Sequence, residues 1–292
     1  MDIVITYVNG GDSQWQKDYQ TATKTPILTK RFRDWGTLRY LLRGIEKNMP
    51  FIRNVYLVVS GDSQVPDWVC RKHLNIVLHQ DIIPAPLLPT FNSNTIEMHL
   101  HNIDGLDEEY LYFNDDFFPI LPCKAEDFFS DGKGVIGMTT HYVAWDMYKK
   151  ICRNSDRLAR KASKAKAPLW FLRPQHICSP MLRSVCAHLY ESQREQILST
   201  ITTTRSEKNV TQYLFLDYMY INGLLVNRAI DKKHFSTAFV TCAQLKRFFE
   251  APTSKLVCIN DVKLSDSRFC ELKKVILEGF EGLFPQKSKY EK

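Results

Sequence analysis

The segment Tyr110-Leu111-Tyr112-Phe113-Asn114-Asp115-Asp116 is a short aromatic and apolar run that ends in an amide and two adjacent carboxylates. A run of this composition is typical of a buried β-strand. Carboxylates at the carboxyl end of such a strand lie where open α/β sheets bind ligands. Two of them indicate a hard divalent cation held against a substrate phosphate. A solvated turn is the alternative, because Asn-Asp-Asp is also favourable turn chemistry.

The sequence on either side alternates between strand and helix patterns. Strand-like runs occupy residues 2–8, 54–59, 76–78 and 255–259. Helical spacing occurs at residues 39–48, 93–102, 176–190 and 210–225, and in a last helix that Ser265 or Asp266 caps and that reaches Leu283. This alternation predicts an α/β fold with a mainly parallel open sheet and helices on both faces. We expect one catalytic domain over 1–292, in which the helical part and last strand, 174–292, complete the site.

The composition is that of an ordinary globular chain, with 292 residues, 44% of them hydrophobic and 24% charged. No window approaches 18 uninterrupted apolar residues, so no membrane span is predicted. The N-terminus lacks the basic start and apolar run of a secretory signal. Eight cysteines occur without Cys-x-x-Cys spacing, which is typical of reduced thiols. We therefore expect a cytoplasmic protein.

The formal net charge of +7 is concentrated in one segment. The cations of that segment are Lys149, Lys150, Arg153, Arg157, Arg160, Lys161, Lys164 and Lys166. They form either a solvated helical face or mobile loop, or a surface for a phosphate-rich substrate, an anionic glycolipid or a membrane. We interpret residues 149–173 as a helical, basic insertion or lid, and we expect no nucleic acid partner.

Several further blocks accompany the acidic motif in a fixed order. The first is Asp2-Ile3-Val4-Ile5-Thr6-Tyr7-Val8-Asn9-Gly10 with Asp12 and Trp15, and the second runs from Arg31-Phe32-Arg33-Asp34 through Leu88-Pro89-Thr90-Phe91-Asn92-Ser93 and His101 to Asn114-Asp115-Asp116. Gln175-His176 with Thr204-Arg205-Ser206-Glu207, and then Cys258-Ile259-Asn260-Asp261, follow. Together these blocks resemble the Stealth family of sugar-phosphate transferases, which includes capsular polysaccharide phosphotransferases and the catalytic subunit of GlcNAc-1-phosphotransferase. Two positions depart from the family pattern: Asn9 replaces a frequent Asp, and Pro180 stands further from His176 than in the usual His-x-Pro.

The resemblance implies a nucleotide-sugar-transferase-like fold of the GT-A type. It implies transfer of a sugar 1-phosphate from a nucleotide sugar to a hydroxyl of a glycan or lipid-linked glycan acceptor. We expect the nucleotide sugar to be UDP-linked. The nucleoside monophosphate leaves, and Mg²⁺ or Mn²⁺ assists. Capsular or cell-surface polysaccharide synthesis, with peripheral attachment to the inner face of the membrane, is the implied setting.

Roles for individual residues follow from the resemblance together with their chemistry. Histidine titrates near neutral pH, and arginine matches phosphate oxygens in a bidentate way. The expected catalytic residues are His176 as the general base, Asp115 and Arg205. The expected substrate-binding residues are Asp2, Asp12, Arg31, Arg33, Asp34, Asn92 and His101. The expected metal ligands are Asp115, Asp116, Asn260 and Asp261.

Two other functions fit parts of the sequence. A metal-dependent glycosyltransferase that moves the sugar without its phosphate would use the same donor and a similar acidic site. A non-enzymatic binder of an anionic polymer would use the cations of residues 149–166, and its binding would depend on salt.

Overall fold

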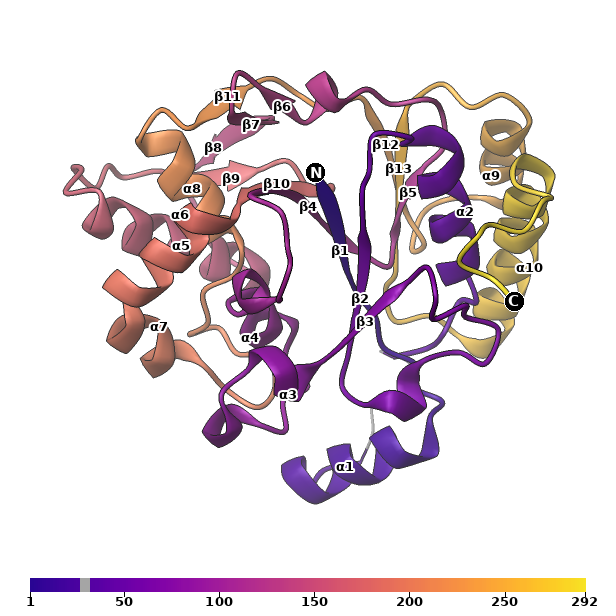
Figure 1. Ribbon diagram of the computed structural model, residues 1–292, viewed down its shortest axis with the longest axis horizontal. Helices are drawn as coiled ribbons and strands as arrows, with labels where there is room; N and C mark the ends of the chain where they lie inside the picture. Colours follow the sequence, from indigo (N-terminus) through magenta and orange to yellow (C-terminus); the bar gives the residue numbers. More distant parts are fainter. Residues whose placement is uncertain (27–31) are drawn as a thin grey trace.

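The computed structural model describes residues 1–26 and 32–292 and contains one central five-stranded sheet. Its strands lie in the order β10 (Ser179–Leu182), β4 (Glu109–Asn114), β1 (Asp2–Thr6), β2 (Val55–Val59) and β3 (Asn75–Leu78). β1 pairs in parallel with β2 and β4, and β2 with β3, whereas β10 is antiparallel to β4. The predicted mainly parallel open sheet is therefore confirmed. The carboxyl ends of the four parallel strands share one edge, toward the bottom of Figure 1.

Helices cover both faces of this sheet (Figure 1), as predicted. On one side lie α2 (Leu38–Asn48), α9 (Cys242–Glu250) and α10 (Asp266–Leu283). On the other side lie α4 (Ser93–Glu97), α5 (Met147–Ala162), α6 (Arg183–Ser192), α7 (Arg194–Thr200) and α8 (Tyr213–Ile221). Two further helices, α1 (Ser13–Thr23) and α3 (His79–Ile82), follow the carboxyl ends of β1 and β3.

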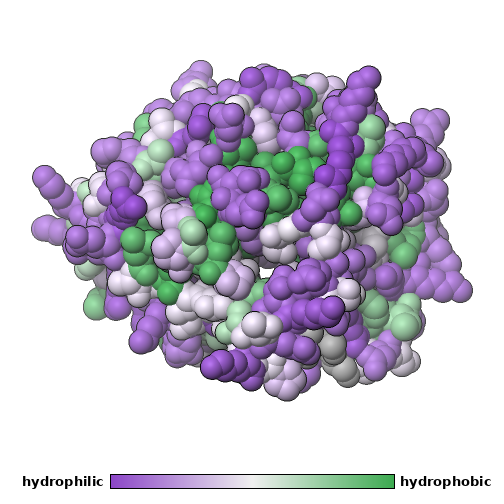
Figure 2. All heavy atoms as spheres, turned by 60° about the horizontal axis from the view of Figure 1, so that its bottom comes forward, coloured by the Kyte–Doolittle hydropathy of each residue, from purple (hydrophilic) through white to green (hydrophobic). Residues whose placement is uncertain are grey.

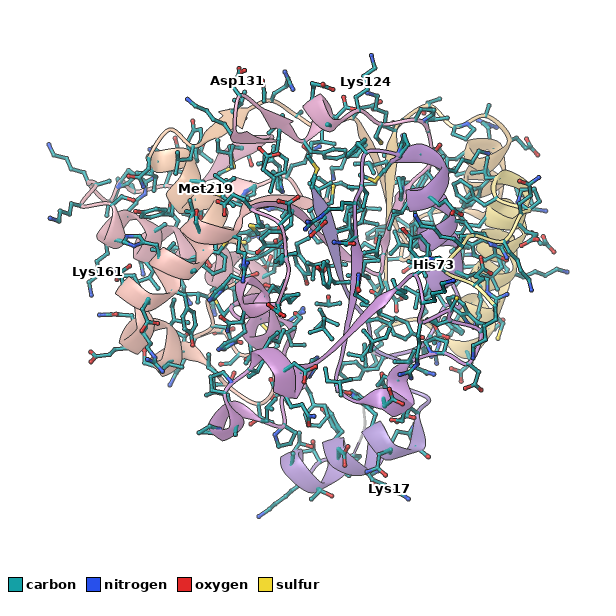
Figure 3. The ribbon with its side chains drawn as sticks, in the orientation of Figure 1. Lys17, His73, Lys124, Asp131, Lys161 and Met219 are labelled. Atoms are coloured by element: carbon teal, nitrogen blue, oxygen red, sulfur yellow. The ribbon has the colours of Figure 1, made fainter. Side chains whose placement is uncertain are left out.

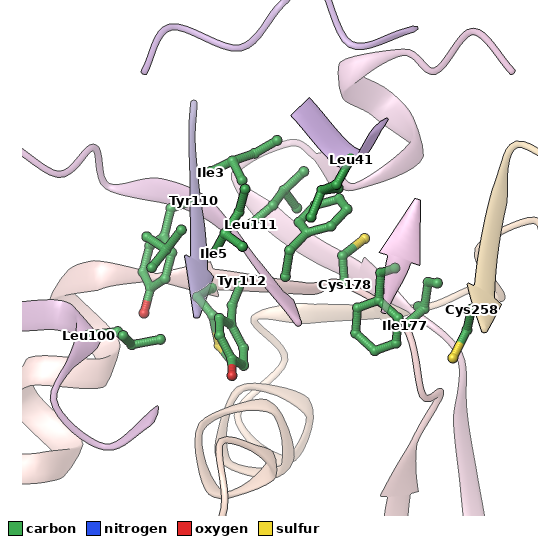
Figure 4. Packing of buried hydrophobic residues seen from close by; sticks show 14 of the residues in the cluster. Ile3, Ile5, Leu41, Leu100, Tyr110, Leu111, Tyr112, Ile177, Cys178 and Cys258 are labelled. Atoms are coloured by element: carbon green, nitrogen blue, oxygen red, sulfur yellow. The ribbon is translucent and has the colours of Figure 1, made fainter. Parts of the chain in front are cut away.

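The core forms because the interior residues of the central strands are apolar. Ile3, Ile5, Leu111 and Phe113 are fully buried, as a sheet covered on both faces requires. Figure 4 shows side chains of β1 and β4 between Leu41 of α2 and Leu100 on the other side. These contacts hold the carboxyl ends of the strands in place.

Three smaller sheets extend the structure. β5 (Phe117–Pro119) pairs with β13 (Leu256–Asn260), which pairs in parallel with β12 (Lys232–Ser236). β6 (Phe129–Ser130) and β11 (Leu225–Asn227) flank β7 (Lys133–Ile136), and β8 (Met138–His141) pairs with β9 (Phe171–Pro174). Only two residues separate β4 from β5, so the second sheet begins beside the carboxyl edge of the first.

One predicted segment has a different structure. The helix predicted over 176–190 is the edge strand β10 followed by α6, which begins at Arg183. β4 supplies the hydrogen-bonding partner for β10, and sequence periodicity cannot reveal such a distant partner. Pro180 is tolerated because β10 is an edge strand.

Most of the basic segment 149–173, predicted as an insertion or lid, belongs to α5. α5 buries Ile151, Cys152 and Ala159, and it packs against α8 and β9. All eight cysteines are unpaired. Across residues 1–26 and 32–292, none of the helices combines the length and apolar character that crossing a membrane requires.

Candidate active site

A cavity of about 1000 Å³ opens at the carboxyl edge of the central sheet. Its walls come from segments far apart in the sequence: the residues after β1, β2 and β4, the end of β13, and parts of α5, β9 and β12. Figure 2 brings this edge forward and shows apolar residues gathered across a largely hydrophilic face. This is the place where open α/β sheets bind ligands.

The two Asn-Asp pairs of the sequence meet in this cavity. Asn114 ends β4, and Asp115 and Asp116 form the turn that leads into β5. β13 pairs with β5, and the backbone N–H of Ile259 donates to the carbonyl of Asp116 at 3.0 Å. Asn260 and Asp261 follow and line the same wall. Asp115 and Asp116 are therefore turn residues, and they also line the cavity.

The clustered carboxylates disfavour one another's ionisation. Burial and the charges of Asp34 and Asp261 raise the pKa of Asp115 to about 7. Burial and the charge of Asp115 raise the pKa of Asp116 to about 8. Burial also raises the pKa of Asp261, and burial followed by the charges of Asp34 and Asp115 raises the pKa of the Tyr7 hydroxyl. The wall therefore concentrates negative charge that a cation would stabilise.

These residues fit a divalent cation. Asp116 Oδ1 is buried and has no hydrogen-bond partner among the described residues. Carboxylate and amide oxygens are the ligands that Mg²⁺ and Mn²⁺ prefer. A second donor set overlaps the first: ligand atoms of Asp116, His176 and Cys258 lie within 4.8 Å of one another. That set includes a thiol and an imidazole and suits a softer metal such as Zn²⁺.

His176 stands beside the acidic wall, in the segment between β9 and β10. Its Nδ1 lies 3.3 Å from the Tyr213 hydroxyl, and its carbonyl accepts a hydrogen bond from Lys232 Nζ at 2.9 Å. Burial, followed by the positive charges of Lys232 and His234, lowers the pKa of His176 to about 4. The imidazole is therefore neutral at pH 7 and able to accept a proton. An anion bound beside His176 would raise the pKa of the imidazole toward the neutral pH range.

Four cations also line the cavity, and the charges of two of them act on the carboxylates. The cations are Arg33, Arg173, Arg205 and Lys232. Arg205 Nη2 donates to Ser93 Oγ at 2.6 Å, and Arg33 Nη1 is buried without a hydrogen-bond partner among the described residues. The guanidinium of Arg173 lies 5.3 Å from the ring centroid of Tyr148. Burial lowers the pKa of Lys232.

The structure thus brings most of the predicted site residues together. Those that line the cavity are Arg33, Asp34, Asp115, Asp116, His176, Arg205, Asn260 and Asp261. Sequence reasoning missed other residues of the lining, which are Tyr7, Glu97, Tyr148, Arg173, Tyr213, Lys232 and His234. Tyr7 and Glu97 belong to the sequence blocks that carry the family resemblance, which is a signal that could have identified them. The other five lie in ordinary helix and strand patterns, so their sequence context carries no signal. Arg31 lies outside the described residues.

Two predicted substrate-binding aspartates have structural roles instead. Asp2 lies at the amino end of β1, away from the cavity, where its carboxylate accepts from Arg53 Nη2 at 2.8 Å and from the backbone N–H of Asp107 at 2.9 Å. Asp12 caps α1 by accepting from the backbone N–H of Trp15 at 2.6 Å. Neither residue lines the cavity. Both carboxylates are instead engaged in the hydrogen bonds just described.

Asn92 and His101 are also placed elsewhere. Asn92 is fully buried and caps α4 while its side-chain amide donates to the Thr202 carbonyl at 3.1 Å and to Asn209 Oδ1 at 3.0 Å. It joins α4 to the segment that carries Arg205. His101 is buried, with its ring centroid 5.1 Å from that of Tyr190.

The chain matches one family model and several named polysaccharide phosphotransferases. The family described as "Stealth protein CR2, conserved region 2" matches residues 31–136. The chain is 39% identical to receptor polysaccharide phosphotransferase WefC of Streptococcus oralis over 140 residues, 45% of this chain and 42% of that protein. It is 36% identical to capsular polysaccharide phosphotransferase eps5J of Streptococcus thermophilus over 53% of this chain and 68% of that protein.

Two other matches extend over almost the whole chain. Exopolysaccharide phosphotransferase cps2G of Lactiplantibacillus plantarum is 28% identical over 100% of this chain and 96% of that protein. A crystal structure of galactosyltransferase LgtC with donor and acceptor sugar analogues matches with a TM-score of 0.40 and 10% identity, over 94% of this chain and 95% of that one.

Proposed function

The chain belongs to the Stealth family, and on that premise we propose that it transfers a sugar 1-phosphate from a nucleotide sugar to a hydroxyl of an acceptor glycan. We take the donor to be UDP-linked and the setting to be capsular or cell-surface polysaccharide synthesis in the cytoplasm. The named relatives are polysaccharide phosphotransferases, which supports the reaction class. The unpaired thiols support a reducing compartment.

One observation carries the proposal: a single cavity holds a carboxylate cluster, several cations and a neutral imidazole. Transfer of a phosphoryl group needs in-line positioning, stabilisation of charge on the phosphate oxygens and a group that accepts the hydroxyl proton. The three kinds of side chain correspond to these three needs. A cavity of about 1000 Å³ is also large enough for a nucleotide sugar.

The cations would bind the diphosphate of the donor. Arg205 presents a planar guanidinium that can donate two hydrogen bonds to phosphate oxygens. Arg33 pairs with Asp266 through Nη2 and has Nη1 left to donate to the same group. Arg173 and Lys232 approach the cavity from β9 and β12, so the diphosphate would lie between them and the carboxylates. Their fixed positions orient the β-phosphorus toward the acceptor.

Asp115, Asp116, Asn260 and Asp261 would hold Mg²⁺ or Mn²⁺. When bound, the cation would neutralise charge on the donor's phosphate oxygens.

His176 would accept the proton of the attacking hydroxyl. His176 Nδ1 lies beside the Tyr213 hydroxyl, to which its N–H would donate, so the unprotonated Nε2 would take up the proton of the attacking hydroxyl. The acceptor oxygen forms a bond to the β-phosphorus, the bond from that phosphorus to the bridging oxygen breaks, and the nucleoside monophosphate leaves with the electron pair. The negative charge of the bound donor raises the pKa of His176 and makes it a stronger base at that moment.

The test is product analysis with a UDP-sugar labelled with ³²P at the β-position, Mg²⁺ and a capsule-type oligosaccharide. Label in the glycan together with release of UMP, both lost in Asp115→Ala and retained in the exposed control Asp104→Ala, supports the proposal. Release of labelled UDP with an unlabelled glycan identifies a glycosyltransferase instead. Salt-sensitive polymer binding that survives Asp115→Ala, without turnover of UDP-, GDP- or CMP-sugars, identifies a binding protein.

A further inference from the structure

A cluster of exposed apolar side chains stands beside the active-site cavity. Among the described residues, the large hydrophobic side chains that are exposed are Tyr142, Val143, Trp145, Met147, Leu169 and Phe239. All except Phe239 belong to one part of the fold: the segment that joins β8 to α5, the first residue of α5, and the segment that leads into β9. We call these five residues the apolar rim. Leu169 is 95% exposed and Trp145 is 72% exposed, so the described residues leave most of their apolar surface uncovered.

The strand pairing brings the two segments of the apolar rim together. β8 and β9 are antiparallel, with His141 opposite Phe171. The residues that follow His141 and those that precede Phe171 therefore leave the same end of this ladder, which places Tyr142 and Val143 near Leu169. Met147 continues the rim to the cavity, which it lines. A surface that binds the rim would thus lie next to the cavity mouth.

Cations flank the apolar rim. Lys149 Nζ lies 4.5 Å from the ring centroid of Trp145. Along the second half of α5 and just after it, four cations are exposed and form no ion pair with any described residue: Arg157, Lys161, Lys164 and Lys166. Lys161 extends outward at the edge of the molecule on the α5 side (Figure 3).

The segment between α5 and β9 is held against the helix. Arg160 Nη1 donates to the Lys166 carbonyl at 3.2 Å, and its guanidinium lies 4.6 Å from the ring centroid of Trp170. Arg160 is itself anchored by a buried ion pair with Asp156 at 3.0 Å. Leu169 therefore stays close to the cationic half of α5 and does not depend on a free loop for its position.

We propose that the apolar rim and these cations dock the protein on an anionic lipid bilayer. Tryptophan and tyrosine side chains favour the headgroup region, apolar side chains enter the acyl boundary, and Lys and Arg attract anionic lipids. The apolar rim is complementary to the acyl boundary of such a bilayer, and the unpaired cations are complementary to its anionic headgroups. Docking would turn the cavity mouth toward a glycan carried on a membrane lipid. This last step rests on the proposed function, whereas the docking itself does not.

The test is cosedimentation with vesicles of phosphatidylcholine alone and of equal parts phosphatidylcholine and phosphatidylglycerol. We expect the protein to bind the anionic vesicles. Binding should be weakened about tenfold or more in Trp145→Ser/Leu169→Ser, because each substitution removes an apolar contact with the bilayer. The matched control is Phe239→Ser, which removes an equally exposed apolar side chain (87%) elsewhere. Absence of vesicle binding, or equal loss in the control, would overturn the proposal.

Charge reversal separates insertion from plain electrostatics. Lys161→Glu/Lys166→Glu should weaken binding to anionic vesicles, and Lys246→Glu/Lys274→Glu, which reverses two exposed charges on α9 and α10, should not. If only the charge variants lose binding and the apolar variant does not, the rim does not insert and the proposal fails.

Turnover distinguishes this inference from the proposed function. The apolar variant should transfer to a water-soluble oligosaccharide at the wild-type rate and lose transfer to the same glycan on a lipid in vesicles. Vesicle binding without any transfer would refute the proposed function and leave docking standing. Transfer by wild-type protein that binds no vesicles would refute docking alone.

Discussion

Replacing Asp116 by asparagine should stabilise the metal-free protein and abolish its activity. The carboxyl carries a pKa raised from 3.8 to about 8. A group whose pKa is raised by folding contributes stability that is fully present below its unfolded pKa and is lost as the pH rises through its folded pKa. The wild-type protein should therefore lose stability between about pH 4 and pH 8, and Asp116→Asn should not show this part of the loss.

The structure sets the magnitude. One pKa unit corresponds to about 1.4 kcal/mol, so the full shift sets an upper bound of about 6 kcal/mol. Asp116 lines an open cavity and is partly exposed, so solvent reduces the cost of its charge. We expect Asp116→Asn to raise the free energy of unfolding by about 2 kcal/mol at pH 8.5 and by much less at pH 4.5.

The assay is urea denaturation of the metal-free protein at the two pH values, with Asp104→Asn as the exposed control. Adding Mg²⁺ at pH 8.5 should stabilise the wild-type protein and have little effect on Asp116→Asn, because the substitution removes a ligand. A variant that is less stable than wild type at pH 8.5, or whose stability difference does not change with pH, would refute this account of the carboxylate cluster.

Three other predictions concern the base, the thiol and the packing. His176→Gln should lower kcat about 10²- to 10⁴-fold with little change in donor affinity, since it removes the proton acceptor; steady-state kinetics test this, and a loss confined to KM would contradict it. Zn²⁺ should inhibit at a site that includes Cys258, so Cys258→Ser should weaken Zn²⁺ binding measured by calorimetry and relieve inhibition; unchanged affinity would exclude the thiol as a ligand. In α10, Gly279→Ala should destabilise by about 1–3 kcal/mol, because the new Cβ would lie 2.2 Å from the Phe249 ring. Gly282→Ala meets no atom within 4 Å and should stabilise by about 1 kcal/mol, so thermal melts that shift both variants in the same direction would contradict the packing argument.

Local patterns were sufficient for the four parallel strands of the central sheet and for several residues of the cavity lining. The apolar run that ends at Asn114 has to be a strand because its side chains are apolar on both faces. Polar residues at its carboxyl end then have to lie at the ligand-binding edge. The same reasoning placed Asp115 and Asp116 in the cavity before any contact was known.

Long-range pairing decided what local patterns could not. Asp261 reaches Asp116 only because β13 pairs with β5, and Lys232 reaches the cavity because β12 pairs with β13. Asp2 is polar and stands at one end of a strand, as Asn114 does, but it is the amino end of β1 and therefore lies at the opposite edge of the sheet.

The sequence by itself determined the class of fold, the family and the chemical types in the site, since these depend on local composition and order along the chain. Only the tertiary structure decided which of the candidate residues share one cavity, how their charges shift one another's pKa values, and that Tyr142 and Leu169 form one exposed surface. Those properties depend on distances between residues remote in sequence, and such distances arise only when the sheets pair and pack.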